Sequence, residues 1–74
     1  MGKPVDPCMG PRAYKVFCQY ITDNDLSVVQ GAKNLGLSPA VPYKWAYGVP
    51  PSAYSLKMLA KVGLDVLWVL LGEE

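Results

Sequence analysis

The sequence predicts an all-α fold, a compact five-helix bundle formed by a chain of 74 residues. Apolar side chains recur at helical spacing: Tyr14, Phe17, Cys18 and Ile21 occupy positions i, i+3, i+4 and i+7 of one helix face. Capping residues and glycines mark helix ends at short intervals, and no alternating apolar and polar stretch predicts a strand. A chain of this length forms a single domain that buries only about 60% of its unfolded surface.

Glycine and proline predict where the first helix begins. Residues 1–10 are rich in both and show no apolar period, so we interpret them as a flexible or extended N-terminal arm. Pro11 suits the first position of a helix, because its missing N–H would have no partner there. We expect this helix at about 11–21, and the domain itself at 11–74.

Ser27 and Gln30 predict the start of the second helix, at about 28–35. In the pattern S-x-x-Q, each side chain accepts a hydrogen bond from a backbone amide that the helix leaves unpaired. Gly36 suits the left-handed conformation that commonly ends a helix, since it has no Cβ. The connection to the next helix is then only three residues, ending at Ser38.

The third helix contains two prolines. Ser38 is the expected N-cap and Pro39 the first helical residue, where proline is well tolerated. Pro42 removes one terminal hydrogen bond, at a cost well below the ~3 kcal/mol of a mid-helix proline. Because a residue before proline disfavours the α region, Val41 is expected to distort the first turn. We predict a helix that is regular only from Pro42 to Tyr47.

A fourth helix is expected at 52–62, with Ser52 as its cap after two prolines and Gly63 as its end. The residues expected to face inward are Leu56, Leu59 and Ala60.

A fifth helix is expected from Val66 to Leu71, between Asp65 as N-cap and Gly72. It is apolar almost all round, which is more than a peripheral helix of a small monomer buries. We therefore predict a two-fold contact between copies through this helix, with completion of the core as the alternative. The predicted contact residues are Trp68, Val69 and Leu71.

Two helices joined by a short turn form the helix-turn-helix unit, whose second helix enters the major groove of DNA. The stretch AKNLGLSPAVPYKW, then Gly48, then LKMLAKVGLDVLWVLLGEE resembles the phage-repressor type (Cro and CI-like, XRE) helix-turn-helix domain. The most specific matches are Ala32, Leu35, Gly36, Ser38, Trp45 and Gly48. The resemblance covers residues 26–74 and implies a lambda-repressor-like DNA-binding domain, commonly dimeric, that occupies an operator.

The resemblance also implies a binding site. It places the base-facing edge on residues 39–41 and Lys44, and it places Tyr47 and Val28 near phosphates. Ser38 and Tyr43 are further polar readers. The predicted DNA-binding residues are Val28, Lys33, Ser38, Pro39, Ala40, Val41, Tyr43, Lys44 and Tyr47. Three residues depart from the family pattern: Gly31 replaces Leu, Pro42 replaces Val or Ile, and Val28 replaces a Gln that often binds phosphate.

Charge is distributed unevenly along the chain. The net charge of +1 is low for a DNA-binding domain. Between Leu26 and Leu64, however, the chain carries four lysines and no carboxylate. These lysines are Lys33, Lys44, Lys57 and Lys61. Such a segment suits the neutralisation of phosphates, and solvated lysines on helix faces are the alternative.

Several function classes are disfavoured. The chain has no histidine, no phosphate-binding loop and no metal-ligand cluster, so we expect no catalytic residue, no metal and no cofactor. Two cysteines and an N-terminus without an apolar core indicate a reducing, cytoplasmic setting. The longest apolar run, 66–71, is far short of the ~20 residues of a membrane span.

These observations predict a sequence-specific regulator of transcription that binds double-stranded DNA as a homodimer. The family resemblance makes it a phage or prophage-type repressor that acts by operator occupancy. The alternative is a helix-turn-helix protein-interaction module with little DNA binding, such as an antirepressor or an inhibitor of a host or phage protein. The low net charge, Val28 and the apolar edge at 39–41 favour this alternative.

Overall fold

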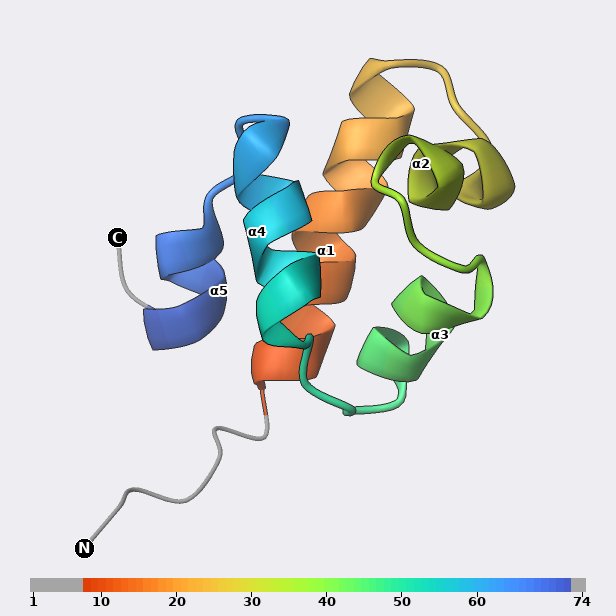
Figure 1. The fold of residues 1–74 in the computed structure, drawn as a ribbon. Helices are drawn as coiled ribbons and strands as arrows, with labels where there is room; N and C mark the ends of the chain where they lie inside the picture. Colours follow the sequence, from red (N-terminus) through yellow and green to blue (C-terminus); the bar gives the residue numbers. More distant parts are fainter. Residues whose placement is uncertain (1–7, 73–74) are drawn as a thin grey trace, which may run out of the picture.

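Five helices and no strand make up residues 8–72, the part of the chain that the computed structural model describes (Figure 1). In chain order they are α1 (Met9–Asp23), α2 (Val28–Asn34), α3 (Ala40–Ala46), α4 (Ala53–Lys61) and α5 (Val66–Leu71). The predicted all-α class and its five helices are confirmed. Most of the arm predicted at 1–10 lies outside the described residues.

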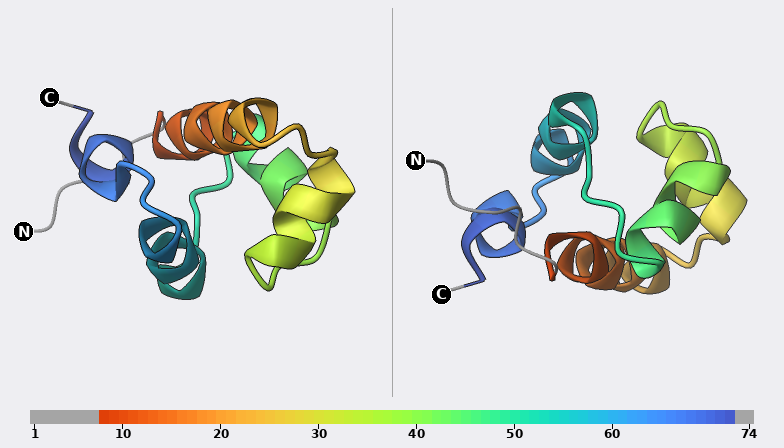
Figure 2. Two further views of the ribbon diagram at one scale, coloured as in Figure 1. Left: turned by 90° about the horizontal axis from the view of Figure 1, so that it is seen from above. Right: turned by 90° about the horizontal axis from the view of Figure 1, so that it is seen from below.

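The longest helix, α1, is the element against which most of the others pack. It contacts α2 and α3 on one side and α5 on another, whereas α4 packs mainly on α5 (Figure 2). Figure 2 shows α4 set apart from α2 and α3. The linker 47–52, which begins with a turn at 47–48, joins α4 to α3. We describe the molecule as an α1–α2–α3 junction and an α4–α5 pair, of which α5 packs mainly on α1 and α4 mainly on α5.

The first helix begins at Met9, two residues earlier than predicted, and the last two residues assigned to the arm are helical. Gly10 is buried, and a Cβ added there would lie 2.6 Å from the Val49 carbonyl oxygen and 2.8 Å from that of Trp45. Because Gly10 packs against the backbone at the end of α3, α1 extends into residues that we expected to belong to the arm. Pro11 is the third helical residue, where its missing N–H still removes no helical hydrogen bond.

The capping box that opens α2 is confirmed. The Ser27 hydroxyl accepts a hydrogen bond from the Gln30 backbone N–H at 3.1 Å, and Gln30 Oε1 accepts one from the Ser27 N–H at 3.0 Å. Within α2, Gly31 lies against α1: an added Cβ would collide with Ile21 Cγ2 and lie 3.1 Å from Phe17 Cζ. The close packing of α2 on α1 thus requires a glycine where the repressor pattern has leucine.

The turn between α2 and α3 closes with two backbone hydrogen bonds. Gly36 has φ of 71°, as predicted, and its N–H donates to the Lys33 carbonyl at 3.0 Å. The Leu37 N–H donates to the Ala32 carbonyl at 2.8 Å, which completes a Schellman motif. The chain therefore leaves α2 in a defined direction.

The third helix begins at Ala40, so the prediction that it is regular only from Pro42 is wrong. Pro39 occupies the N-cap position, and the Ser38 hydroxyl accepts a long hydrogen bond of 3.4 Å from the Ala40 N–H. Val41 is helical despite the proline that follows it, and its N–H donates to the Ser38 carbonyl three residues back at 3.0 Å. Burial of the Pro42 ring offsets the unfavourable backbone of its predecessor.

A small apolar core joins all five helices. Its fully buried side chains include Ala13, Phe17, Ala32, Leu35, Pro42, Trp45, Leu59 and Val69. Phe17 and Trp45 meet edge to face, with ring centroids 6.0 Å apart and planes at 81°, a favourable geometry for aromatic pairs. Leu59 is buried as predicted, Leu56 is half-buried, and Ala60 is exposed, because α4 turns only one narrow face to the core.

Both ends of α5 are capped as predicted. Asp65 Oδ1 accepts a hydrogen bond from the Trp68 N–H at 2.9 Å, and Gly72 is left-handed with φ of 71°. Val69 is fully buried, so it completes the core and its place in the predicted dimer contact is wrong. The Arg12 Nε donates to the Val69 carbonyl at 3.0 Å, which fastens α5 to α1.

Candidate functional site

The third helix has one buried face and one exposed face. Pro42 and Trp45 point into the core, whereas Tyr43, Lys44 and Tyr47 are exposed. The Tyr47 ring is 88% exposed although its carbon skeleton is apolar. Because the opposite face is fixed in the core, these three polar side chains project from a rigid support.

The structure places the predicted DNA-binding residues in two groups. The exposed group comes from the α2–turn–α3 region, and we call it the exposed edge: Lys33, Ser38, Pro39, Ala40, Tyr43, Lys44 and Tyr47. Val28 and Val41 differ from these residues, since both are half-buried and pack against the core. Val28 opens α2 as expected, but its side chain covers the core and does not form part of the exposed edge.

The exposed edge has a simple electrostatic character. Lys44 contributes an ammonium group, Tyr43 and Tyr47 contribute hydroxyl groups, and residues 38–40 contribute one hydroxyl group among apolar atoms. The carboxylate-free segment 26–64 contains all of them, so no acidic side chain of this segment opposes an anion. The edge is thus suited to an anionic partner.

A tyrosine of α1 has an altered acidity near this region. The pKa of the Tyr14 phenol is raised above its ordinary value, chiefly by a hydrogen bond with the Cys18 side chain and to a lesser extent by Tyr43. A phenol with its ordinary pKa is already neutral at pH 7, and a higher pKa keeps it neutral. It therefore adds no negative charge beside the exposed edge.

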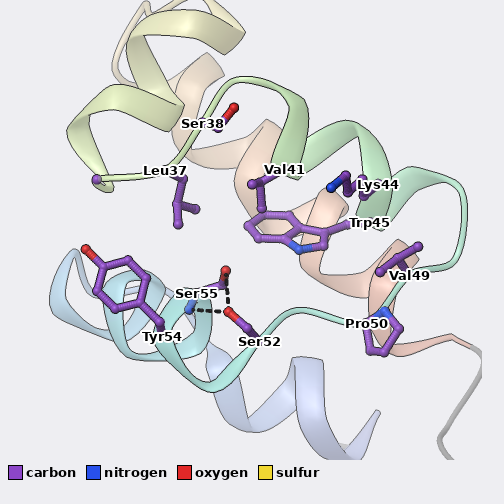
Figure 3. A pocket seen from close by; sticks show the side chains of 11 residues that line it. Leu37, Ser38, Val41, Lys44, Trp45, Val49, Pro50, Ser52, Tyr54 and Ser55 are labelled. Carbon is purple, nitrogen blue, oxygen red and sulfur yellow. Dashed lines mark hydrogen bonds between the residues drawn. The ribbon is translucent and has the colours of Figure 1, made fainter.

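An apolar groove of about 380 Å³ lies between α3 and α4 (Figure 3). Its lining residues are Gly36, Leu37, Ser38, Val41, Lys44, Trp45, Val49, Pro50, Ser52, Tyr54 and Ser55. Figure 3 shows Val41 and Trp45 facing Tyr54 across the groove. Ser52 and Ser55 are joined by a hydrogen bond of 3.1 Å between their hydroxyl groups. The groove is apolar, with one cation, Lys44, among its lining residues.

Sequence reasoning missed this groove. It arises because the linker through Val49, Pro50 and Pro51 carries α4 away from α3, and no periodicity within either helix reports that separation. The two consecutive prolines were the available signal, since proline restricts the backbone to extended conformations before it.

Metal and membrane sites are not found in the described part of the chain. Residues 8–72 contain no group of three His, Cys, Asp or Glu side chains placed to hold a metal ion. None of the helices in this range is long and apolar enough to cross a membrane.

Comparison of the chain with protein-family models, with curated proteins and with solved structures gave no match. The resemblance to phage-repressor domains therefore rests on the residues quoted above. DNA binding, repression, dimer formation and the absence of catalysis stay predictions.

Proposed function

We propose that the chain is a sequence-specific regulator that binds double-stranded DNA, with α2, the turn and α3 acting as a helix-turn-helix unit. The observation that carries this proposal is the two-sided character of α3. Pro42 and Trp45 anchor the helix in the core, while Tyr43, Lys44 and Tyr47 project from it. An exposed helix fixed from behind is what insertion into a major groove requires.

The exposed side chains divide between base and backbone contacts. Lys44 lies in the last turn of α3, and its ammonium group can donate to guanine O6 and N7. Pro39 and Ala40 offer apolar contact to thymine methyl groups. Tyr47, which ends the helix and is the most exposed of the set, is suited to donate its hydroxyl proton to a phosphate.

The charge distribution supports the same function. The segment 26–64 carries four lysines and no carboxylate, although the whole chain has a net charge of only +1. Phosphate neutralisation depends on local cations, and two copies on one site would double their number. We propose a phage or prophage-type repressor that acts by occupying a two-fold operator.

A selection of bound duplexes from random DNA, followed by salt titration of the selected site, tests this function. Lys44→Ala is expected to lower the salt slope by about 1 if the lysine meets a phosphate, or to cost ~1–3 kcal/mol at one base pair if it meets a base. Lys15→Ala is the matched control, since it removes the same charge from α1 beside Trp68. Absence of duplex binding at low salt, or equal binding by both variants, would overturn the proposal.

A second candidate function is protein interaction, as an antirepressor or as an inhibitor of a host or phage protein. The apolar groove beside α3 favours it, together with the low net charge. The two functions differ in their response to salt. DNA binding weakens log-linearly as salt rises, whereas an apolar contact is strengthened by salts such as sulfate.

A further inference from the structure

The groove between α3 and α4 has the size of a small-molecule site. Its volume of about 380 Å³ lies within the ~300–1,000 Å³ that is typical of ligand pockets. Figure 3 shows the Trp45 ring on one side of the groove and the Tyr54 ring on the other. The turn approaches Tyr54 as well, since a Cβ added at Gly36 would lie 2.9 Å from Tyr54 Oη. Two helices and the turn between α2 and α3 thus enclose a space that a small molecule can enter.

The walls of the groove include aromatic and aliphatic surface that the fold does not cover. Tyr54 is 53% exposed and Val49 is 49% exposed, and both side chains line the groove. Trp45 and Val41 line it from the side of the core. Aromatic rings pack favourably on one another in offset or edge-to-face arrangements. The body of a ligand that suits this lining is therefore apolar, and an aromatic ring suits it best.

The charge of the groove comes from a single side chain. Among its eleven lining residues Lys44 is the only one with a charge, and none of the eleven is Asp or Glu. Figure 3 shows the Lys44 side chain beside the Trp45 ring. An ammonium group has three donor protons and no acceptor, and its hydrogen bonds to a carboxylate are charge-assisted. A ligand whose ring lies on Trp45 is therefore favoured when it carries a carboxylate on the side of Lys44.

A buried hydroxyl group supplies a second donor on the side of α4. Ser55 is only 2% exposed, and Figure 3 shows its oxygen directed into the groove. Its Oγ accepts a hydrogen bond of 3.1 Å from the Ser52 hydroxyl, while Ser52 Oγ accepts one of 3.1 Å from the Ser55 N–H. The bond between the two hydroxyl groups uses one of their two protons, and within residues 8–72 the other has no acceptor. Because a buried donor without a partner is costly, an oxygen of a ligand beside Ser55 is favoured.

We propose that the groove between α3 and α4 binds a small aromatic carboxylate. The ring of this ligand lies between Trp45 and Tyr54, and its carboxylate accepts hydrogen bonds from the Lys44 ammonium group. An oxygen at the opposite end of the ligand accepts the free hydroxyl proton at Ser55. An apolar wall with two donors and no acid specifies this class, because a cation would meet Lys44 and a pure hydrocarbon would leave both donors unpaired. A ligand of about twelve non-hydrogen atoms is expected to bind with a Kd of about 1 mM or lower.

The ligand would regulate DNA binding, and this step alone rests on the proposed function. Lys44 belongs both to the exposed edge and to the lining of the groove. A carboxylate bound to its ammonium group would occupy the donor that we assign to DNA. The ligand is therefore expected to weaken duplex binding, and the duplex to weaken ligand binding by the same factor.

Titration of the full chain with 4-acetylbenzoate, without DNA, tests the site by NMR of the two tryptophan indole N–H signals. The signal of Trp45 is expected to shift, and that of Trp68, which lies outside the groove and is identified with Trp68→Phe, is not. Lys44→Met should lower the preference for this probe over 4-acetylbenzamide about tenfold, since it removes the charged donor. Ser55→Ala should lower the preference over 4-isopropylbenzoate, which has the same shape without the oxygen, about fivefold. Lys57→Met, on α4 outside the groove, is the control and should change neither preference.

Three results would overturn the proposal. A Trp45 signal that does not shift at about 10 mM probe, ten times the expected limit of the Kd, would exclude the site. A shift of the Trp68 signal alone would place the bound probe beside α1 and α5. Equal loss of preference in Lys44→Met and Lys57→Met would show that the charge acts at a distance and forms no contact. Circular dichroism of each variant shows that it is folded, and the absence of DNA keeps these results separate from the test of duplex binding.

Discussion

The α1–α2–α3 junction and the α4–α5 pair are held together in different ways. In the junction, Gly10 and Gly31 allow backbones and side chains to approach closely around the Phe17–Trp45 pair. The α4–α5 pair contributes only Leu59 and Val69 as fully buried apolar side chains, and several of its other apolar side chains are exposed. Tight packing makes the junction a rigid support for the outer face of α3, whereas the looser pair leaves apolar surface for contacts with other molecules.

The largest difference between the regions is expected for their large apolar side chains. Trp45→Ala removes the largest fully buried side chain and its edge-to-face partner contact, so it should cost ~3–5 kcal/mol of unfolding free energy. Leu71→Ala, on the exposed face of α5, should change the same quantity by less than ~0.5 kcal/mol. Urea denaturation of dilute protein measures both. Similar losses for the two variants would contradict the burial of Trp45 and the exposure of Leu71.

A smaller effect is expected for Gly31→Ala. Alanine is favoured over glycine in a helix by ~1 kcal/mol, but the added Cβ would collide with Ile21 Cγ2, and overpacking costs ~1–3 kcal/mol. Net destabilisation is therefore expected. In an Ile21→Ala background the collision with Cγ2 is removed while the 3.1 Å approach to Phe17 Cζ remains, so the cost of Gly31→Ala should fall. A double-mutant cycle by thermal unfolding measures this coupling, and additive effects would show that the close approach is unimportant.

Removal of a helix cap is expected to lower the free energy of unfolding by a still smaller amount, similar in the two regions. Ser27→Ala and Ser52→Ala each remove a side-chain cap with a hydrogen bond of 3.1 Å, so each should cost about 1 kcal/mol. Ser38→Ala is the control, since its hydroxyl accepts only a long bond of 3.4 Å, and we expect less than ~0.5 kcal/mol. Denaturant titration of the three variants ranks them, and a large loss for Ser38→Ala would mean that it is the true cap of α3.

Features that depend on a few neighbouring residues were predictable from the sequence. The reciprocal bonds of Ser27 and Gln30, the left-handed Gly36 and the Asp65 cap all follow from local chemistry. The early start of α1 was not predictable, because Gly10 is buried by the end of α3, far away in sequence. The same is true of Val69, whose burial depends on how α5 meets α1.

The residues of the candidate site also divide into those that were predictable from the sequence and those that were not. The family resemblance placed Lys44 and Tyr47 on the DNA-facing side, and the side chains of both are exposed, as is that of Tyr43. It did not predict that Val41 would turn toward the groove, since the groove exists only because the linker holds α4 apart from α3. The site residues of a single helix can thus be predicted from the sequence of that helix. A surface that two helices share can be predicted only when the fold is known.

The smallest effect on stability is expected for Tyr47, a residue that we propose to contact DNA. Tyr47→Phe removes only the hydroxyl group of a ring that is 88% exposed, so the unfolding free energy should change by less than ~0.5 kcal/mol. If the hydroxyl donates to a phosphate, affinity for the selected duplex should fall by ~1.5–3 kcal/mol, the range for hydrogen bonds to charged groups. Tyr54→Phe, which removes the same group from α4, should leave affinity unchanged. Fluorescence anisotropy at fixed salt measures both variants, and equal affinities would remove Tyr47 from the proposed contact. A change in binding without a change in stability is the behaviour expected of a side chain that the tight junction supports but does not bury.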